Sequence, residues 1–390
     1  MRVARHVEPG AARSLALATV SITLGAIPVF LLGALAVFIR EELGFSEALL
    51  GLLASAYYAS STLMSIPGGR LTERVGGRKG IAAGAALTAV SMFGIAAFGR
   101  SWAVLLLFMI VAGSANGFAM PASNLVVARD VPLRRQGVAF GLKQSSGPFA
   151  TLVAGTSVPV IGLTVGWRWA FVMVGAIALP LMLAGRGPQA ATARVDRTDG
   201  DVATAALVIL AAGAALAVVG GSSIAAFYVE SVVAAGISPG VAGTLLAIGS
   251  IAGIAGRVGW GWVGGRWHAG HVPLLTALAG VGAIGYLLLG HASSLGTVVV
   301  ATIVVFTTGW GWPGLFNFAV VVRSAAAPAV ATGIVATGMY AGGIAGPSIF
   351  GLLVERGGYS LAWSFVAAMS SASAMLLLRG GRKLEAHNAN

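Results

Sequence analysis

The segment GGRLTERVGGRKG, residues 68–80, carries four basic residues and one acidic residue between two long apolar runs. The rest of the chain is poor in charge, with 9% charged residues, 57% hydrophobic residues and a mean hydropathy of +0.90. A soluble domain has about 25% charged residues, because its surface faces water. So few charges cannot coat a 39.0 kDa globule. We therefore expect the chain to lie in a lipid bilayer.

Apolar runs of about 20 residues cross a bilayer as helices. The first run is too long for the core of a signal peptide, so we count it as a helix. The sequence predicts an all-α membrane protein with twelve transmembrane helices, at residues 14–39, 46–68, 80–99, 103–127, 137–163, 167–185, 203–229, 240–262, 272–290, 294–321, 329–354 and 358–378.

The placement of Lys and Arg predicts the orientation of these helices. With the N-terminus in the cytoplasm, 18 of the 24 Lys and Arg residues fall in cytoplasmic segments, 4 in outer loops and 2 within helices. We therefore expect a bacterial cytoplasmic membrane protein with both termini in the cytoplasm. The net charge of +12 then reflects topology and attraction to anionic lipid rather than nucleic-acid binding.

The chain also repeats itself at an offset of 192 to 194 residues. An even number of helices in each repeat makes the repeats parallel about an axis along the membrane normal. We predict two six-helix bundles at residues 1–185 and 203–390, joined by a cytoplasmic linker at 186–202. The landmarks that pair at this offset are Leu52 with Leu245, Gly69 with Gly261, Arg74 with Arg266, Arg129 with Arg323, and Trp169 with Trp363.

The opening segment resembles the loop signature of the major facilitator superfamily, G-x-x-x-D-R/K-x-G-R/K-R/K. Glu73 stands at the aspartate position, and Gly77 stands at a position that is usually basic. The resemblance implies alternating access, with the acidic residue latching the start of helix 11. In the second half, Gly265 takes the acidic position. By this resemblance, the predicted latch residues are Gly69, Glu73, Arg74, Gly76, Arg78, Arg129 and Asp130. The alternative is that these charges only orient a short loop.

Two basic residues, Lys143 and Arg257, lie inside predicted helices 5 and 8. Ionisable groups within a membrane are costly and mark candidate sites. In the superfamily these helices face one cavity, so the resemblance implies that an anionic substrate balances both charges. The spacing around Arg257 is similar to that of nitrate/nitrite porters and, more loosely, cyanate and nitroimidazole porters. Ser65 stands where those proteins have a second arginine, which favours a larger carboxylate. The alternative is that both side chains reach the cytoplasmic surface.

Other polar and aromatic residues in predicted helices are candidates to line the same cavity. For the amides, the alternative is a hydrogen bond between helices. For the aromatic residues, the alternatives are ordinary packing or anchoring at the membrane interface. The candidates are Gln144, Asn116, Asn124, Asn317, Tyr57, Tyr58, Tyr340, Trp310 and Trp312.

These observations predict a secondary transporter of a small organic anion, a monomer whose partners are the substrate, the lipid bilayer and protons. No acidic residue lies at the midplane of a predicted helix, and Glu230 stands at the end of helix 7. Two possibilities follow: the anion binds together with a proton at Lys143 and Arg257, or transport is by exchange or uniport. The alternatives are drug efflux, favoured by Gly147-Pro148, and a non-transporting sensor. The chain has no cysteine, no P-loop and no metal-ligand spacing of histidines, so we predict no enzymatic activity, cofactor or metal.

Overall fold

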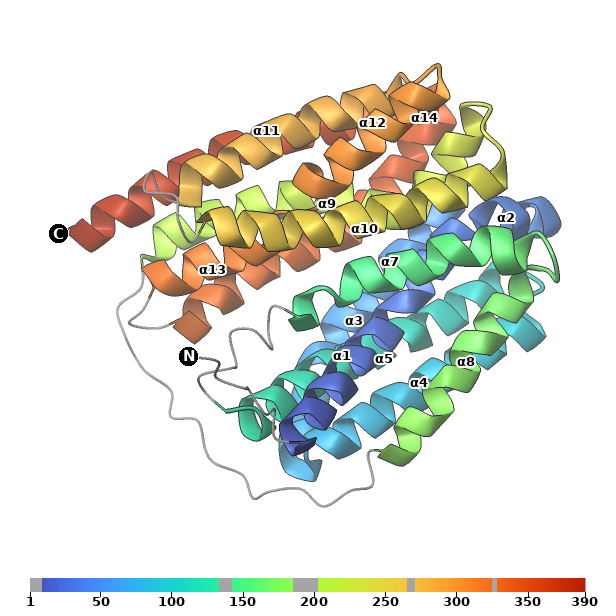
Figure 1. Ribbon diagram of the computed structural model, residues 1–390, viewed down its shortest axis with the longest axis horizontal. Helices are drawn as coiled ribbons and strands as arrows, with labels where there is room; N and C mark the ends of the chain where they lie inside the picture. The colour runs from blue at the N-terminus through green and yellow to red at the C-terminus, as the bar shows by residue number, and fades with distance from the viewer. Residues whose placement is uncertain (1–8, 133–141, 185–202, 265–270, 325–327, 390) are drawn as a thin grey trace, which may run out of the picture. The chain divides into compact units, whose positions relative to one another are not determined.

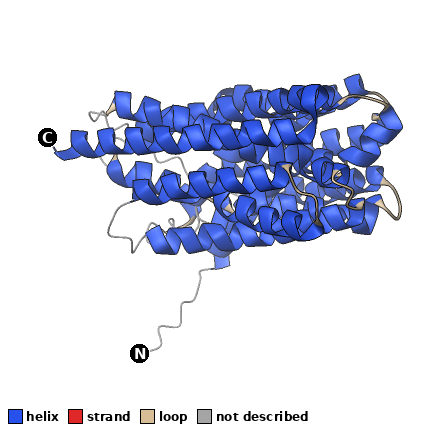
Figure 2. Cartoon of the chain, turned by 90° about the horizontal axis from the view of Figure 1, so that it is seen from above, coloured by secondary structure: helices blue, strands red, loops and turns tan. Residues whose placement is uncertain are grey.

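The structure is a computed structural model that describes residues 9–132, 142–184, 203–264, 271–324 and 328–389. Within these ranges every regular element is a helix (Figures 1 and 2). Nine of the helices described there are long and apolar enough to cross a membrane. One of them contains two predicted spans, and the apolar helix Trp167–Leu183 is shorter than these nine. The all-α membrane class is confirmed, and the structure is consistent with twelve spans.

The first half of the chain contains seven described α-helices and one π-helix. They are α1 (Pro9–Ala34), α2 (Ala36–Leu43), α3 (Glu47–Val75), α4 (Gly77–Phe98), α5 (Trp102–Asp130), α7 (Ser146–Ser157), which continues into the π-helical η1 (Val158–Gly162), and α8 (Trp167–Ala184). The second half contains α9 (Thr204–Ala234), α10 (Pro239–Gly264), α11 (His271–Gly290), α12 (Leu295–Val304), the π-helical η2 (Val305–Gly309), α13 (Pro313–Arg323) and α14 (Pro328–Ala389).

Several predicted spans differ from the helices. The helical path of the first span breaks at Leu35 and continues in α2, so Arg40 lies on a helix and not in an outer loop as predicted. The span at 294–321 divides into α12, η2 and α13. The last two spans share α14, which leaves helical geometry only at Gly357 and Gly358. The predicted linker and Arg266 lie outside the described residues.

The chain forms two compact units that are described separately. The first unit comprises Met1–Pro28, Ala59–Ala150 and Arg168–Arg194, and the second comprises Val29–Tyr58, Thr151–Trp167 and Val195–Asn390. The second unit therefore combines parts of α1, α2, α3, α7 and η1 with α9 to α14. The division at residues 186–202 stays a prediction.

In the first unit, α4 packs closely against α5 because small residues face it. A Cβ atom on Gly77 would lie 2.8 Å from Val126 Cγ2, and one on Gly80 would lie 2.9 Å from Ala122 Cβ. Close approach of backbones is a usual source of helix association in lipid, where apolar burial gives little gain. The turn into α4 consists of Gly76 alone, whose φ is 100° and ψ is 150°. Only glycine adopts this backbone conformation readily.

In the second unit, three helix pairs approach each other at positions where a side chain would collide with a neighbour. Gly33 of α1 meets the Ala225 carbonyl of α9, and Gly51 of α3 meets the Pro347 carbonyl of α14. Gly155 of α7 faces Gly243 of α10, where a Cβ on either residue would lie 2.7 Å from the other's carbonyl oxygen. By the predicted topology, all three contacts lie in the half of the membrane that faces outward.

Two serines join α3 to α14 beside the Gly51 contact. Ser348 Oγ lies 2.8 Å from Ser55 Oγ, and the Ser348 backbone N–H donates to the same oxygen at 3.2 Å. Both serines are therefore positioned to report whether these two helices are in contact. Because the chain has no cysteine, introduced thiols are the only ones present.

We predict that the double variant Ser55→Cys/Ser348→Cys forms an intramolecular disulfide under mild oxidation. The two hydroxyl oxygens already lie within hydrogen-bonding distance, so short backbone shifts bring the sulfurs together. Blocking of maleimide–polyethylene glycol modification, reversed by reductant, measures the bond, with each single variant as control. Two thiols that both remain modifiable after oxidation contradict the α3–α14 contact.

We also predict that Gly76→Ala lowers the thermal stability of the purified protein. The backbone conformation at this residue costs a non-glycine residue about 1–3 kcal/mol. Gly259→Ala is the matched control, because a Cβ atom there meets nothing within 4 Å and no left-handed backbone is involved. Equal midpoints of thermal unfolding for the two variants would show that the α3–α4 turn is not as described.

Candidate functional site

The segment from Leu295 to Arg323 is a helix that breaks in its middle. In η2 the Trp310 N–H donates to the Val305 carbonyl, five residues earlier, at 2.9 Å. Trp310 then leaves helical geometry, with φ −120° and ψ −2°. Pro313, the first residue of α13, has no N–H to continue the ladder. Within a bilayer the carbonyls released by such a break need other donors.

The helix α10 supplies these donors. Gly249, Gly253 and Gly256 lie along one side of α10 and face η2, where a Cβ on Gly256 would lie 3.0 Å from the Thr307 Cα. This close packing brings two side chains of α10 to the break. Arg257 Nη2 donates to the Trp310 carbonyl at 2.8 Å, and Trp260 Nε1 donates to the Thr307 carbonyl at 2.7 Å. The GxxxGxxGR pattern of residues 249–257 thus positions the arginine.

These contacts use only some of the hydrogen-bond donors of the Arg257 guanidinium. Its carbon atom lies 4.8 Å from the centre of the Trp310 ring, a cation–π geometry. Its second terminal nitrogen, Nη1, is buried and has no hydrogen-bond partner among the described residues. None of the ion pairs found in that part of the chain includes Arg257. A buried cation without a counter-charge is costly, which makes this nitrogen a candidate anion-binding position.

The ring of Trp310 is fixed from several sides. Phe30 of α1 lies 5.7 Å from it between ring centroids, and Phe306 of η2 lies 5.6 Å away in an edge-on arrangement. Gly221 of α9 leaves room for the indole, because a Cβ there would lie 2.6 Å from Trp310 Cδ1. The indole therefore serves as a packed platform under the arginine. From the sequence, Trp310 was only one of several candidates to line the cavity.

Trp312, the other tryptophan, has a different environment. It is 2% exposed and belongs to the hydrophobic core of the second unit, with its ring 5.4 Å from that of Phe316. Tyr57 is also buried, and its ring meets Tyr58 edge-on at 5.3 Å. Tyr340 and Asn317 are half-buried on α14 and α13. Their predicted role in binding stays a prediction.

The other predicted binding residues lie in the first unit. Lys143 is 3% exposed and donates a hydrogen bond to Asn124 Oδ1, which joins two of the candidates. Asn116 Nδ2 of α5 donates to Ser61 Oγ of α3 at 2.9 Å, which matches the alternative of a bond between helices. Gln144 is exposed. Since Lys143 and Arg257 belong to different units, their predicted convergence stays a prediction.

The motif residues form a polar cluster of their own in the first unit. Arg78 Nη2 lies 3.5 Å from Asp130 Oδ2, and Ser14 Oγ of α1 donates to the same oxygen at 2.5 Å. Arg78 also donates to Ser14 Oγ at 3.3 Å. The cluster therefore connects α1, α4 and α5. Ser14 was missed because nothing in the sequence marks a serine near the first basic residues as a partner of Asp130.

The remaining latch residues lie around this cluster. Glu73 and Arg74 are exposed on the last turn of α3, and Arg129 is half-buried on α5 beside Asp130. Gly69 lies over Pro121, whose Cβ would be 3.6 Å from a Cβ on the glycine. The latching role of Glu73 stays a prediction.

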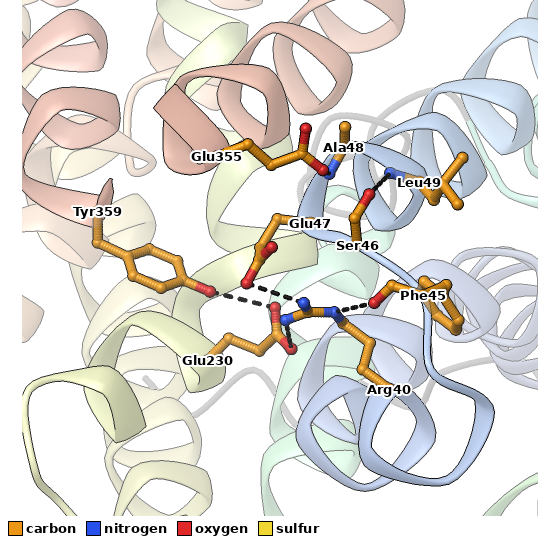
Figure 3. Close-up of polar contacts among 9 residues, drawn as sticks. All are labelled: Arg40, Phe45, Ser46, Glu47, Ala48, Leu49, Glu230, Glu355 and Tyr359. Atoms are coloured by element: carbon orange, nitrogen blue, oxygen red, sulfur yellow. Dashed lines mark hydrogen bonds and ion pairs between the residues drawn. The ribbon is translucent and has the colours of Figure 1, made fainter. Parts of the chain in front are cut away.

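A second charged cluster, which we call the outer cluster, consists of Arg40, Glu47, Glu230 and Tyr359 (Figure 3). Arg40 Nη1 lies 2.8 Å from Glu230 Oε1, and Arg40 Nη2 lies 2.8 Å from Glu47 Oε1. Tyr359 Oη donates to Glu230 Oε2 at 3.2 Å. Burial alone would lower the pKa of Arg40, but Glu230 and Glu47 raise it above its ordinary value. The sequence does not reveal this cluster, because 190 residues separate Arg40 from Glu230.

The sequence and the fold of this chain are similar to those of known proteins. A family model described as Major Facilitator Superfamily matches residues 14–329. A putative tartrate transporter of Agrobacterium vitis is 24% identical over 394 residues, covering 89% of this chain and 85% of its own. Among solved structures, a D-xylose-proton symporter is 16% identical with a TM-score of 0.76, covering 94% of this chain and 96% of its own, a likeness of fold alone.

Two relatives match over shorter regions. A probable sulfoacetate transporter, SauU of Cupriavidus necator, is 29% identical over 141 residues, 36% of this chain and 33% of its own length. The quinolone resistance protein NorA of Staphylococcus aureus is 29% identical over 122 residues, 31% of this chain and 29% of its own. In both cases the match spans about a third of the relative or less.

Proposed function

Because the chain belongs to the major facilitator superfamily, we propose that it is a secondary transporter that moves a small organic anion across the membrane by alternating access. The observation that carries this proposal is the Nη1 atom of Arg257, buried and without a partner among the described residues. An anion that reaches this atom supplies the counter-charge that the surrounding protein lacks there. The same family assignment supports a transporter rather than an enzyme.

A carboxylate suits the geometry of the guanidinium. Arg257 already uses Nη2 on the Trp310 carbonyl, so Nη1 remains for a charge-assisted hydrogen bond to the ligand. The packed indole under the guanidinium fixes its plane and limits the entropy lost on binding. The tartrate and sulfoacetate transporters among the relatives are named for organic anions, which supports the same substrate class.

The finer assignments remain proposals. The likeness of the Arg257 spacing to nitrate/nitrite and cyanate porters suggests a branch, and the distribution of Lys and Arg suggests a bacterial inner membrane with cytoplasmic termini. NorA among the relatives keeps drug efflux as the second candidate. The two candidates differ in what they require: an anion needs the arginine, whereas a cationic drug is repelled by it.

We predict that Arg257→Ala lowers the apparent affinity for an organic anion about tenfold to a hundredfold in counterflow. A hydrogen bond to a charged group contributes about 1.5–3 kcal/mol, and about 1.4 kcal/mol corresponds to a factor of ten. Purified protein in liposomes, loaded with tartrate or sulfoacetate, provides the measurement. The apparent affinity of Arg257→Lys should fall between those of the wild type and Arg257→Ala, because lysine keeps the charge and loses the planar guanidinium.

Arg382→Ala is the matched control, since Arg382 is exposed on α14 and makes no contact in this site. It should leave counterflow unchanged. Full activity of Arg257→Ala on the anions would remove the basis of the proposal. Transport of a cationic dye by the wild type, with no exchange of either anion, would favour drug efflux instead.

A further inference from the structure

We propose that Glu230 is the proton-binding site that couples transport, and that its protonation releases the outer cluster. The inference rests on the proposed transport function and adds to it a residue that carries the coupling ion. In Figure 3, Glu230 and Tyr359 approach from α9 and α14, whereas Arg40 and Glu47 approach from α2 and α3. The ion pair between Arg40 and Glu230 therefore links elements that are far apart in the sequence.

The two carboxylates bound to Arg40 have different structural roles. Glu47 begins α3, which follows α2 directly, so its bond to Arg40 joins neighbouring elements. Glu230 lies on α9, so its bond to Arg40 spans the second unit. Protonation of Glu230 removes the cross-link and leaves the local pair between Arg40 and Glu47 in place. Protonation of Glu47 has the opposite effect and leaves the cross-link intact.

The outer cluster and its surroundings contain more carboxylates than basic groups, which favours binding of a proton. The charged and titratable groups that face Glu230 are Arg40 and Glu41 of α2, Glu47 of α3 and Tyr359 of α14, all of which line one pocket of about 370 Å³. Glu355 of α14 is not among the residues that line this pocket, and it accepts a hydrogen bond from the Ala48 N–H at 3.0 Å. Among the described residues, one guanidinium thus shares this pocket with three carboxylates. Of the two that bind it, Glu230 has a side chain 4% exposed, against 26% for Glu47.

Protons have a route to this carboxylate. The pocket is walled by Glu41 and Ala234, which are exposed, so it opens to solvent. Glu230 therefore combines two properties that a coupling site needs: a buried charge held by a removable partner, and access to water on the side predicted to face outward. When the cross-link is lost, Tyr359 is the one hydrogen-bond donor left to the buried carboxylate among the described residues, and a proton then neutralises it.

Loss of the ion pair between Arg40 and Glu230 should weaken the close contacts between helices of the same unit. Gly33 of α1 meets α9 at Ala225, and Gly51 of α3 meets α14 at Pro347, in the same unit as the outer cluster. Alternating access requires such contacts to separate when the outer side opens. The ionised cluster holds them together, so we expect acidic pH to favour their separation.

The first test separates coupling from substrate binding in proteoliposomes with tartrate or sulfoacetate. We expect Glu230→Gln to keep counterflow at symmetric pH and to lose accumulation driven by a pH gradient. Glu47→Gln, the matched control on the same arginine, should keep both. Glu230→Asp keeps a titratable group and should keep partial accumulation. Gradient-driven accumulation in Glu230→Gln would overturn the inference and leave the anion transporter standing, whereas absence of wild-type counterflow would count against the transporter.

The second test needs no substrate. A thiol introduced by Ser55→Cys lies at the α3–α14 contact and reacts with an impermeant maleimide only when the helices separate. We expect labelling to rise about tenfold from neutral to mildly acidic pH, the effect of losing one charge-assisted pair. In Glu230→Gln labelling should be fast at both pH values, and in Glu47→Gln it should follow the wild type. The same pH response with and without Glu230 would overturn the inference.

Discussion

Lipid offers no hydrogen bonds, and the candidate site follows from that constraint. A chain in the bilayer must satisfy its backbone internally, which makes it helical and makes every break in a helix expensive. The break between η2 and α13 is satisfied from α10, by Arg257 on the Trp310 carbonyl and Trp260 on the Thr307 carbonyl. The arginine thus stabilises the broken helix. In this position its Nη1 atom is buried and has no hydrogen-bond partner among the described residues.

The same constraint explains why glycine recurs at the contacts that matter for transport. Helices in lipid associate through close packing rather than through apolar burial. Gly256 lets α10 reach η2, and Gly51 lets α3 reach α14. Such contacts separate without exposing large apolar side chains. They therefore suit surfaces that open and close, and a charged cluster such as that of Arg40 and Glu230 then decides which arrangement is favoured.

Sequence alone predicted the helical class, the positions of most helices and the special character of Arg257, because all three depend on local composition. It did not predict the break at Trp310, because π-helical hydrogen bonding is decided by packing against α10. It gave Trp310 and Trp312 alike as candidates for the cavity, and the structure buries the side chain of Trp312 in the core. It also described Glu230 as a residue at a helix end. Its pairing with Arg40 depends on how distant segments pack, which no local pattern records.

An experimental structure with a bound bromine-labelled organic carboxylate tests the central claim most directly, because the anomalous signal locates the ligand. The account predicts a carboxylate oxygen within about 3 Å of Arg257 Nη1, the range of a charge-assisted hydrogen bond, with Nη2 still on the Trp310 carbonyl. A ligand bound elsewhere, or an Arg257 Nη1 already paired with a carboxylate of the protein, would contradict it.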